Sequence, residues 1–128
     1  MALHTELKIY KDASDLLRVV TAAVVQMPKG AKPVIGRRLI DDCLQVTERI
    51  RQANAAVGRD KAPERVAHIE KLLGHVANVK DLLGSSWDQR LVSNGRYGKA
   101  AQLTVEIGKQ ANGWRTKSQQ PVASGARP

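Results

Sequence analysis

The sequence predicts an all-α protein, an up-down-up-down four-helix bundle with a disordered basic C-terminal tail. Apolar residues recur three or four positions apart along four segments, and short stretches with proline, glycine or serine separate these segments. Residues 19–25 are rich in β-branched side chains and could pass for a strand, but the helical spacing on both sides of them favours a helix. The 128 residues, 42% of them hydrophobic, are enough for one domain with its own core. We expect residues 1–114 to form the bundle and residues 115–128 a flexible basic tail.

The first helix is expected over residues 7–27, where a single apolar stripe lies along one face. Residues 28–33 contain two prolines and a glycine, which end that helix. Pro33 suits the first turn of a second helix, whose apolar stripe extends to Val57.

The third helix is expected to start at Pro63 and to continue to about Arg90, again with apolar residues at helical spacing. Ser93 is a suitable N-cap for the fourth helix, because its hydroxyl can accept a hydrogen bond from a free N–H of the first turn. The apolar stripe of this helix ends at Trp114.

Aromatic residues are few, and phenylalanine is absent. The core must therefore consist of leucine, valine, isoleucine and alanine, and folds that bind nucleic acid on several aromatic side chains are disfavoured. Trp87 and Trp114 lie on apolar stripes, so we expect both in the core; the alternative is exposure at a partner interface.

The chain has one cysteine, Cys43, so it can form no intrachain disulfide, which is typical of the reducing cytoplasm. Cys43 lies on an apolar stripe, where a buried structural thiol is expected. The N-terminus lacks the pattern of a signal peptide, and the longest uncharged run is too short to span a membrane. We therefore expect a cytoplasmic protein without a membrane partner.

Positive charge is concentrated in two parts of the chain. The net charge is 0 over residues 1–28, +4 over 29–59, 0 over 60–84 and +5 over 85–128, which gives +9 in total. Because alternate helices of such a bundle are diagonal, two separate basic edges are expected, and an oligomer could merge them.

This charge favours binding to the phosphate backbone of RNA or DNA with little sequence specificity. A solvated surface that maintains solubility and a surface for an acidic protein are the alternatives. The candidate binding residues are Arg37, Arg38, Arg49, Arg51, Arg90, Arg96 and Lys99.

No catalytic or metal site is expected. His68 and His75 are seven residues apart, whereas helical metal sites usually use a spacing of three or four. Asp41 and Asp42 point about 100° apart on a helix, so we expect surface carboxylates paired with nearby arginines. The glycines of residues 95–99 lack the spacing and the preceding strand of a phosphate-binding loop. The sequence therefore indicates neither an enzyme nor a cofactor.

Several short motifs together resemble a known family. In chain order they are LKIYKDA (7–13), MPK (27–29), IGRRL (35–39), Tyr97, EIGK (106–109) and GW (113–114). Their order is similar to that in the four-helix-bundle proteins encoded by intervening sequences of bacterial ribosomal RNA genes. It more closely resembles the accessory variability determinant (Avd) proteins of phage diversity-generating retroelements.

The resemblance implies a non-enzymatic partner of the retroelement reverse transcriptase that binds RNA or DNA and supports mutagenic reverse transcription in the bacterial host cell. It also implies a ring of identical chains, a homopentamer, and a close helix approach at Gly36. Extra helix breakers around residues 84–95 depart from the family pattern. Two alternatives stay open: a stand-alone, sequence-nonspecific nucleic-acid binder, and a protein-binding scaffold whose charge serves only solubility.

Overall fold

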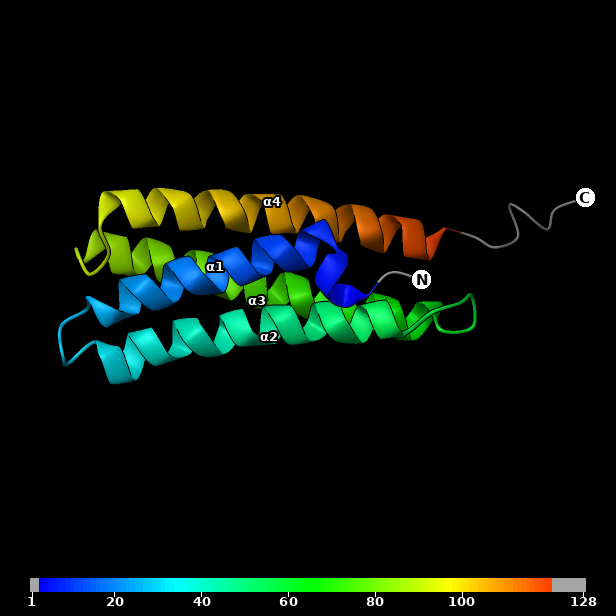
Figure 1. The fold of residues 1–128 in the computed structure, drawn as a ribbon, viewed down its shortest axis with the longest axis horizontal. Helices are drawn as coiled ribbons and strands as arrows, with labels where there is room; N and C mark the ends of the chain where they lie inside the picture. The colour runs from blue at the N-terminus through cyan, green and yellow to red at the C-terminus, as the bar shows by residue number, and fades with distance from the viewer. Residues whose placement is uncertain (1–2, 121–128) are drawn as a thin grey trace, which may run out of the picture.

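A computed structural model describes residues 3–120, in which four helices pack side by side along one long axis (Figure 1). They are α1 (Lys8–Val25), α2 (Arg37–Ala55), α3 (Ala62–Asp88) and α4 (Asn94–Gln119). A 3₁₀ turn at His4–Glu6 precedes α1, and a π-helical turn at Lys32–Gly36 leads into α2. This part of the chain contains no β-strand, which confirms the predicted all-α bundle.

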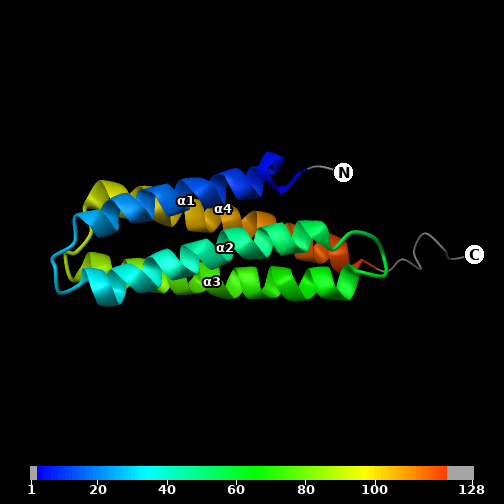
Figure 2. The ribbon, with the colours of Figure 1, turned by 60° about the horizontal axis from the view of Figure 1, so that its bottom comes forward.

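The helices alternate in direction and close into a square. α1 packs against α2 and α4, and α3 packs against the same two helices, so α2 and α4 are diagonal to each other. Figures 1 and 2 show the α1–α2 and α3–α4 connections at one end of the bundle, here named the loop end. α1 begins and α4 ends at the opposite, terminal end, beside the α2–α3 connection.

The core is aliphatic, as predicted. The largest side chains that are fully buried are Leu16, Leu39, Ile50, Ile69, Leu72, Leu83 and Ile107. Each such side chain contributes about 1.5–3 kcal/mol of transfer free energy. Ser86 and Thr104 are buried polar residues, and their hydroxyls donate to backbone carbonyls within their own helices at 2.7 Å. None of the described helices combines the length and apolar character that a membrane span requires.

Ser93 caps α4 as predicted, because its Oγ accepts from the backbone N–H of Arg96 at 3.3 Å. The expected start of the tail at residue 115 is wrong, since α4 continues through Gln119. Arg65 explains the extra turn: its Nε donates to Ser118 Oγ at 2.9 Å, and its Nη1 donates to the carbonyl of Ala56 at 2.7 Å. The remainder of the predicted tail, residues 121–128, lies outside the described residues.

The close approach expected at Gly36 is present where α1 meets the start of α2. A Cβ atom on Gly36 would lie 2.6 Å from Cγ1 of Val24, which is closer than real Cβ atoms come to a neighbour. The φ angle of Gly36 is −60°, so the site requires glycine for lack of space rather than for backbone conformation.

We predict that Gly36→Ala lowers the free energy of unfolding by about 1–3 kcal/mol, because the added methyl group forces α1 and α2 apart. The matched control is Gly74→Ala, on an open surface of α3. This substitution should raise the free energy of unfolding by up to about 1 kcal/mol, because alanine has a higher helix propensity than glycine. Urea denaturation followed by circular dichroism measures both. Equal stabilisation by the two substitutions would contradict the close approach.

Candidate nucleic-acid interface

Seven exposed basic residues gather at the loop end of the bundle. We name them the loop-end cluster: Lys29, Lys32, Arg37, Arg38, Arg90, Arg96 and Lys99. They lie in the two connections and in the first two turns of α2 and α4. Five of the seven sequence-predicted binding residues belong to this cluster.

Helix direction explains why these charges meet. α2 and α4 are diagonal, as expected, but both begin at the loop end, and their basic residues lie in their first turns. With neighbouring helix axes about 8–10 Å apart, the starts of the two helices are roughly 14 Å apart. The two basic regions expected on diagonal helices therefore begin at the same end of the monomer.

Few carboxylates neutralise the cluster. Within residues 3–120, the side chains of Lys29, Lys32, Arg38, Arg90 and Arg96 have neither an ion pair nor a hydrogen bond. Arg37 approaches the exposed Asp41 at 3.9 Å, which screens its charge only weakly.

Lys99 has a weaker electrostatic contact with α1. Burial raises the pKa of the Asp12 carboxyl, but hydrogen bonds from Lys8 and Gln110 lower it more, and the charge of Lys99 adds to that lowering. The net effect is a lowered pKa, so Asp12 is ionised at neutral pH and bridges α1 and α4.

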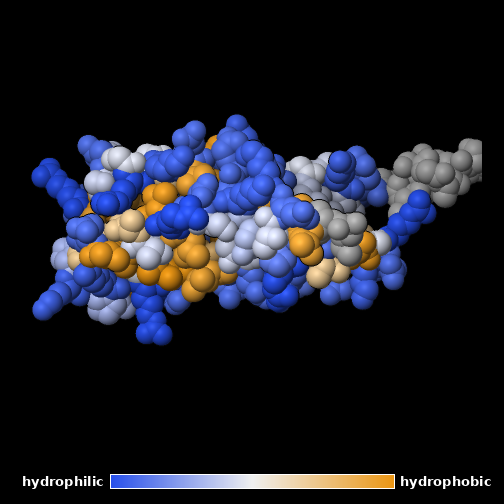
Figure 3. All heavy atoms as spheres, in the orientation of Figure 1, coloured by the Kyte–Doolittle hydropathy of each residue, from blue (hydrophilic) through white to orange (hydrophobic). Residues whose placement is uncertain are grey.

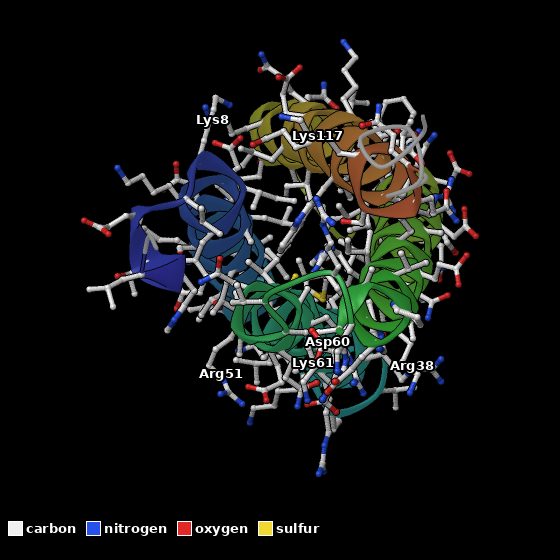
Figure 4. All side chains as sticks on the ribbon, turned by 90° about the vertical axis from the view of Figure 1, so that its right-hand side faces the viewer. Lys8, Arg38, Arg51, Asp60, Lys61 and Lys117 are labelled. Carbon is white, nitrogen blue, oxygen red and sulfur yellow. The ribbon has the colours of Figure 1, made fainter. Side chains whose placement is uncertain are left out.

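Basic residues elsewhere in the bundle are paired more fully. Ion pairs away from the loop end join Lys8 to Asp12, Arg51 to Glu48, Lys61 to Glu64, Lys109 to Glu106 and Arg115 to Glu70. Figure 4 looks along the bundle from the terminal end, where Lys61 lies beside Asp60. Toward the terminal end Lys11, Arg59 and Lys117 also have neither an ion pair nor a hydrogen bond, so within residues 3–120 the two ends differ in the share of cations that is left without a partner.

The cluster also lies where helix electrostatics disfavours it. Arg96 occupies the first turn of α4, and Lys32 occupies the first turn of the π-helical segment that runs into α2; neither turn contains an acidic residue. The macrodipole is positive there, and each cation at such a position costs about 0.3–1 kcal/mol at an exposed site. A bound anion would reverse this unfavourable interaction.

Arg90 is the one non-glycine residue with positive φ, at 61°, among the described residues. It follows the end of α3 in a Schellman motif, in which Arg90 N–H donates to Trp87 O at 2.9 Å and Leu91 N–H to Ser86 O at 2.8 Å. Glycine is preferred at this left-handed position because other residues are strained there. Stability alone therefore does not explain an arginine here.

The other two predicted binding residues do not join the cluster. Arg49 is half-buried between α2 and α3, where its Nη1 donates to Gln52 Oε1 at 2.9 Å and lies 3.3 Å from His68 Nδ1. Arg51 is paired with Glu48, and this hydrogen-bonded pair lowers the pKa of Glu48 and raises that of Arg51. Both lie about 18 Å or more from Arg37 along α2.

The expected surface position is wrong for Asp42, which is 8% exposed. Its Oδ1 accepts from His75 Nδ1 at 2.9 Å, so the carboxylate joins α2 to α3 instead of pairing with an arginine. Asp41 is exposed and lies beside Arg37, as expected.

Cys43 is fully buried, and burial raises the pKa of its thiol to about 12, which confirms a structural role. Residues 3–120 hold no group of three or more histidine, cysteine or acidic side chains that could bind a metal ion.

Sequence reasoning missed three features of the loop end. Lys29 and Lys32 are not among the predicted binding residues, although they lie in a connection with two prolines, which indicates an exposed loop. Trp87 was expected in the core, yet it is 41% exposed and stacks on Tyr97. Trp114, which was also expected in the core, is half-buried and packs against it.

No protein-family model matches the chain, and no curated protein matches it significantly. The resemblance to the retroelement accessory proteins therefore stays a prediction from short motifs.

We predict that Arg90→Gly raises the free energy of unfolding by about 1 kcal/mol, because it relieves the left-handed strain at the end of α3. The matched control is Gln89→Gly, whose backbone has a right-handed φ of −86°. Gln89→Gly should lower the free energy of unfolding by about 0.5–1 kcal/mol, because glycine gives the unfolded chain more conformational entropy. Urea denaturation measures the free energy of unfolding of both variants. If Arg90→Gly is less stable than the wild-type protein, the backbone at Arg90 is not strained.

Proposed function

We propose that this protein binds RNA or DNA through the loop-end cluster, by contacts to phosphates rather than to a particular base sequence. The observation that carries the proposal is the set of exposed, unpartnered cations at one end, two of them in the first turns of helices. Phosphates would neutralise these cations, release counterions and interact favourably with the N-termini of α4 and of the π-helical turn that leads into α2.

We also propose a non-enzymatic role as an accessory protein of a diversity-generating retroelement, associated with its reverse transcriptase during mutagenic reverse transcription in the cytoplasm of a bacterial host. This finer proposal is supported by the ordered motifs and by the match between a basic bundle and that role. A stand-alone architectural binder would use the same loop-end cluster without an enzyme partner. A protein-binding scaffold would not depend on this cluster.

Self-association belongs to the same proposal. Figure 3 shows apolar side chains over the neighbouring halves of α1 and α2 toward the loop end. Gly36 contacts α1, and Ile40 and Leu44 follow it at intervals of four on the same side of α2. Ile40 is half-buried and Leu44 is 47% exposed, so this side of α2 offers an apolar face to a second copy. A homopentameric ring, as the resemblance implies, would bring several loop-end clusters together.

The proposed phosphate contacts predict that Arg37→Glu with Arg38→Glu, or Arg96→Glu with Lys99→Glu, weakens nucleic-acid binding at least tenfold at about 50 mM salt. Losing two contacts should also reduce the slope of log affinity against log salt by about 1.8. Fluorescence anisotropy with a labelled oligonucleotide measures both quantities, and circular dichroism checks that helicity is retained.

The matched control for charge is Arg59→Glu with Lys117→Glu, because both residues are exposed and line one pocket between the α2–α3 connection and the end of α4, at the terminal end. It makes the same change in net charge and should cost less than about threefold in affinity. Equal losses in all three double variants would contradict a localised site, and unchanged affinity in both loop-end variants would overturn the proposal.

The proposed ring predicts a mass of about five chains of 14.0 kDa by light scattering, at both low and high salt. Leu44→Glu should give a monomer, because it places a carboxylate in the apolar contact. Val105→Glu is the matched control, since Val105 is also 47% exposed but lies on α4. A monomeric wild-type protein would overturn self-association and favour the stand-alone binder.

A further inference from the structure

Trp87 lies at the last turn of α3 with its indole ring held by α4. The ring stacks on Tyr97 with centroids 4.7 Å apart and planes 8° apart, and its Nε1 donates to Asn94 Oδ1 at 2.8 Å. One ring face and the Nε1 edge are therefore occupied. Trp87 is nevertheless 41% exposed and lines an open pocket, so the part of the residue that Tyr97 and Asn94 leave uncovered is accessible there.

The surroundings of this ring are polar and basic. A pocket of about 520 Å³ is lined by Trp87, Asp88, Arg90, Val92, Ser93 and Asn94. Its other apolar residue, Val92, is buried, so no continuous apolar surface surrounds the tryptophan. The anchor residues of protein–protein interfaces lie in well-packed, desolvated centres, and this isolated ring beside cations differs from them.

We propose that the open face of Trp87 is a stacking platform for one unpaired nucleobase, so that the loop end prefers single-stranded RNA or DNA to a duplex. The proposal rests on the proposed function, because the phosphates on either side of the base would be held by Arg90 and Arg96. Every base has a π-face, so stacking adds affinity without adding sequence specificity.

The rest of the pocket fits this occupant. The carboxylate of Asp88 repels phosphate on its side of the pocket, and it can accept a hydrogen bond from the amino group of a base. The contacts with Tyr97 and Asn94 hold the ring in place before binding, so little side-chain entropy is lost when a base stacks. One such platform suffices for one base, even in a chain with few aromatic residues.

The test compares a labelled single-stranded oligonucleotide with a blunt duplex of the same sequence by fluorescence anisotropy, over a series of salt concentrations. Trp87→Ala should weaken single-strand binding about 5- to 150-fold and leave duplex binding unchanged, since paired bases are not free to stack. The slope of log affinity against log salt should not change, because no phosphate contact is lost. Arg90→Gly should reduce that slope by about 1.

Two further variants separate stacking from folding. Trp87→Leu retains an apolar contact with Tyr97 but has no ring, so it should lose as much single-strand affinity as Trp87→Ala. Trp87→Phe should retain most of the affinity, because its ring can still stack. In a Trp114→Phe background, single-stranded oligonucleotide should quench the fluorescence of Trp87, whereas the duplex should not.

Each outcome has a separate meaning. If the wild-type protein binds neither oligonucleotide, the proposed function itself fails. If it binds both and the Trp87 variants bind them equally well, the platform is wrong while phosphate binding stands, and the exposed ring serves another contact, such as one with a protein. Equal losses for single strand and duplex in Trp87→Ala and Trp87→Leu would also overturn the platform.

Discussion

The alternating direction of four helices joined by short connections is the constraint on which the rest of this structure depends. In such a bundle the second and fourth helices must begin at the same end, although they are diagonal and separated by the whole of α3. Residues that are distant in sequence, at the starts of α2 and α4, are therefore brought to one surface. The same geometry places the exposed Trp87, at the end of α3, beside Arg90 and Ser93.

The aliphatic core makes the unfavourable features of the loop end tolerable. Cations near helix N-termini cost a few tenths to 1 kcal/mol each, and the left-handed Arg90 costs about 1 kcal/mol. Burial of a single leucine or isoleucine side chain stabilises the fold by more than either of these costs, and α1 and α2 each bury several aliphatic side chains in the core. The bundle can therefore retain charges that reduce its stability, which is common where a surface is shaped by binding.

Much of the fold could be predicted from residue spacing, because apolar periodicity and capping are local. The four helices, the Ser93 cap and the buried Cys43 follow from such patterns. The last turn of α4 could not be predicted, since polar residues there are held by Arg65 across 53 positions.

The candidate site could be predicted only in part, for the same reason. The excess of charge in two segments is visible in the sequence, and five of the seven predicted binding residues lie at the loop end. Arg49 was misassigned because its partner, His68, comes from a different helix. Trp87 differs from the expectation because it lies on an apolar stripe but at the end of a helix, where α4 covers only part of it.

The buried thiol of Cys43 has a practical consequence for studying this molecule. It is the only cysteine in the chain, it is inaccessible, and its pKa of about 12 leaves almost no thiolate at neutral pH. A cysteine introduced on the surface would therefore be the single site that reacts with a maleimide dye or a spin label. Distances and motions at either end of the bundle can be followed in the folded protein without first removing a core side chain.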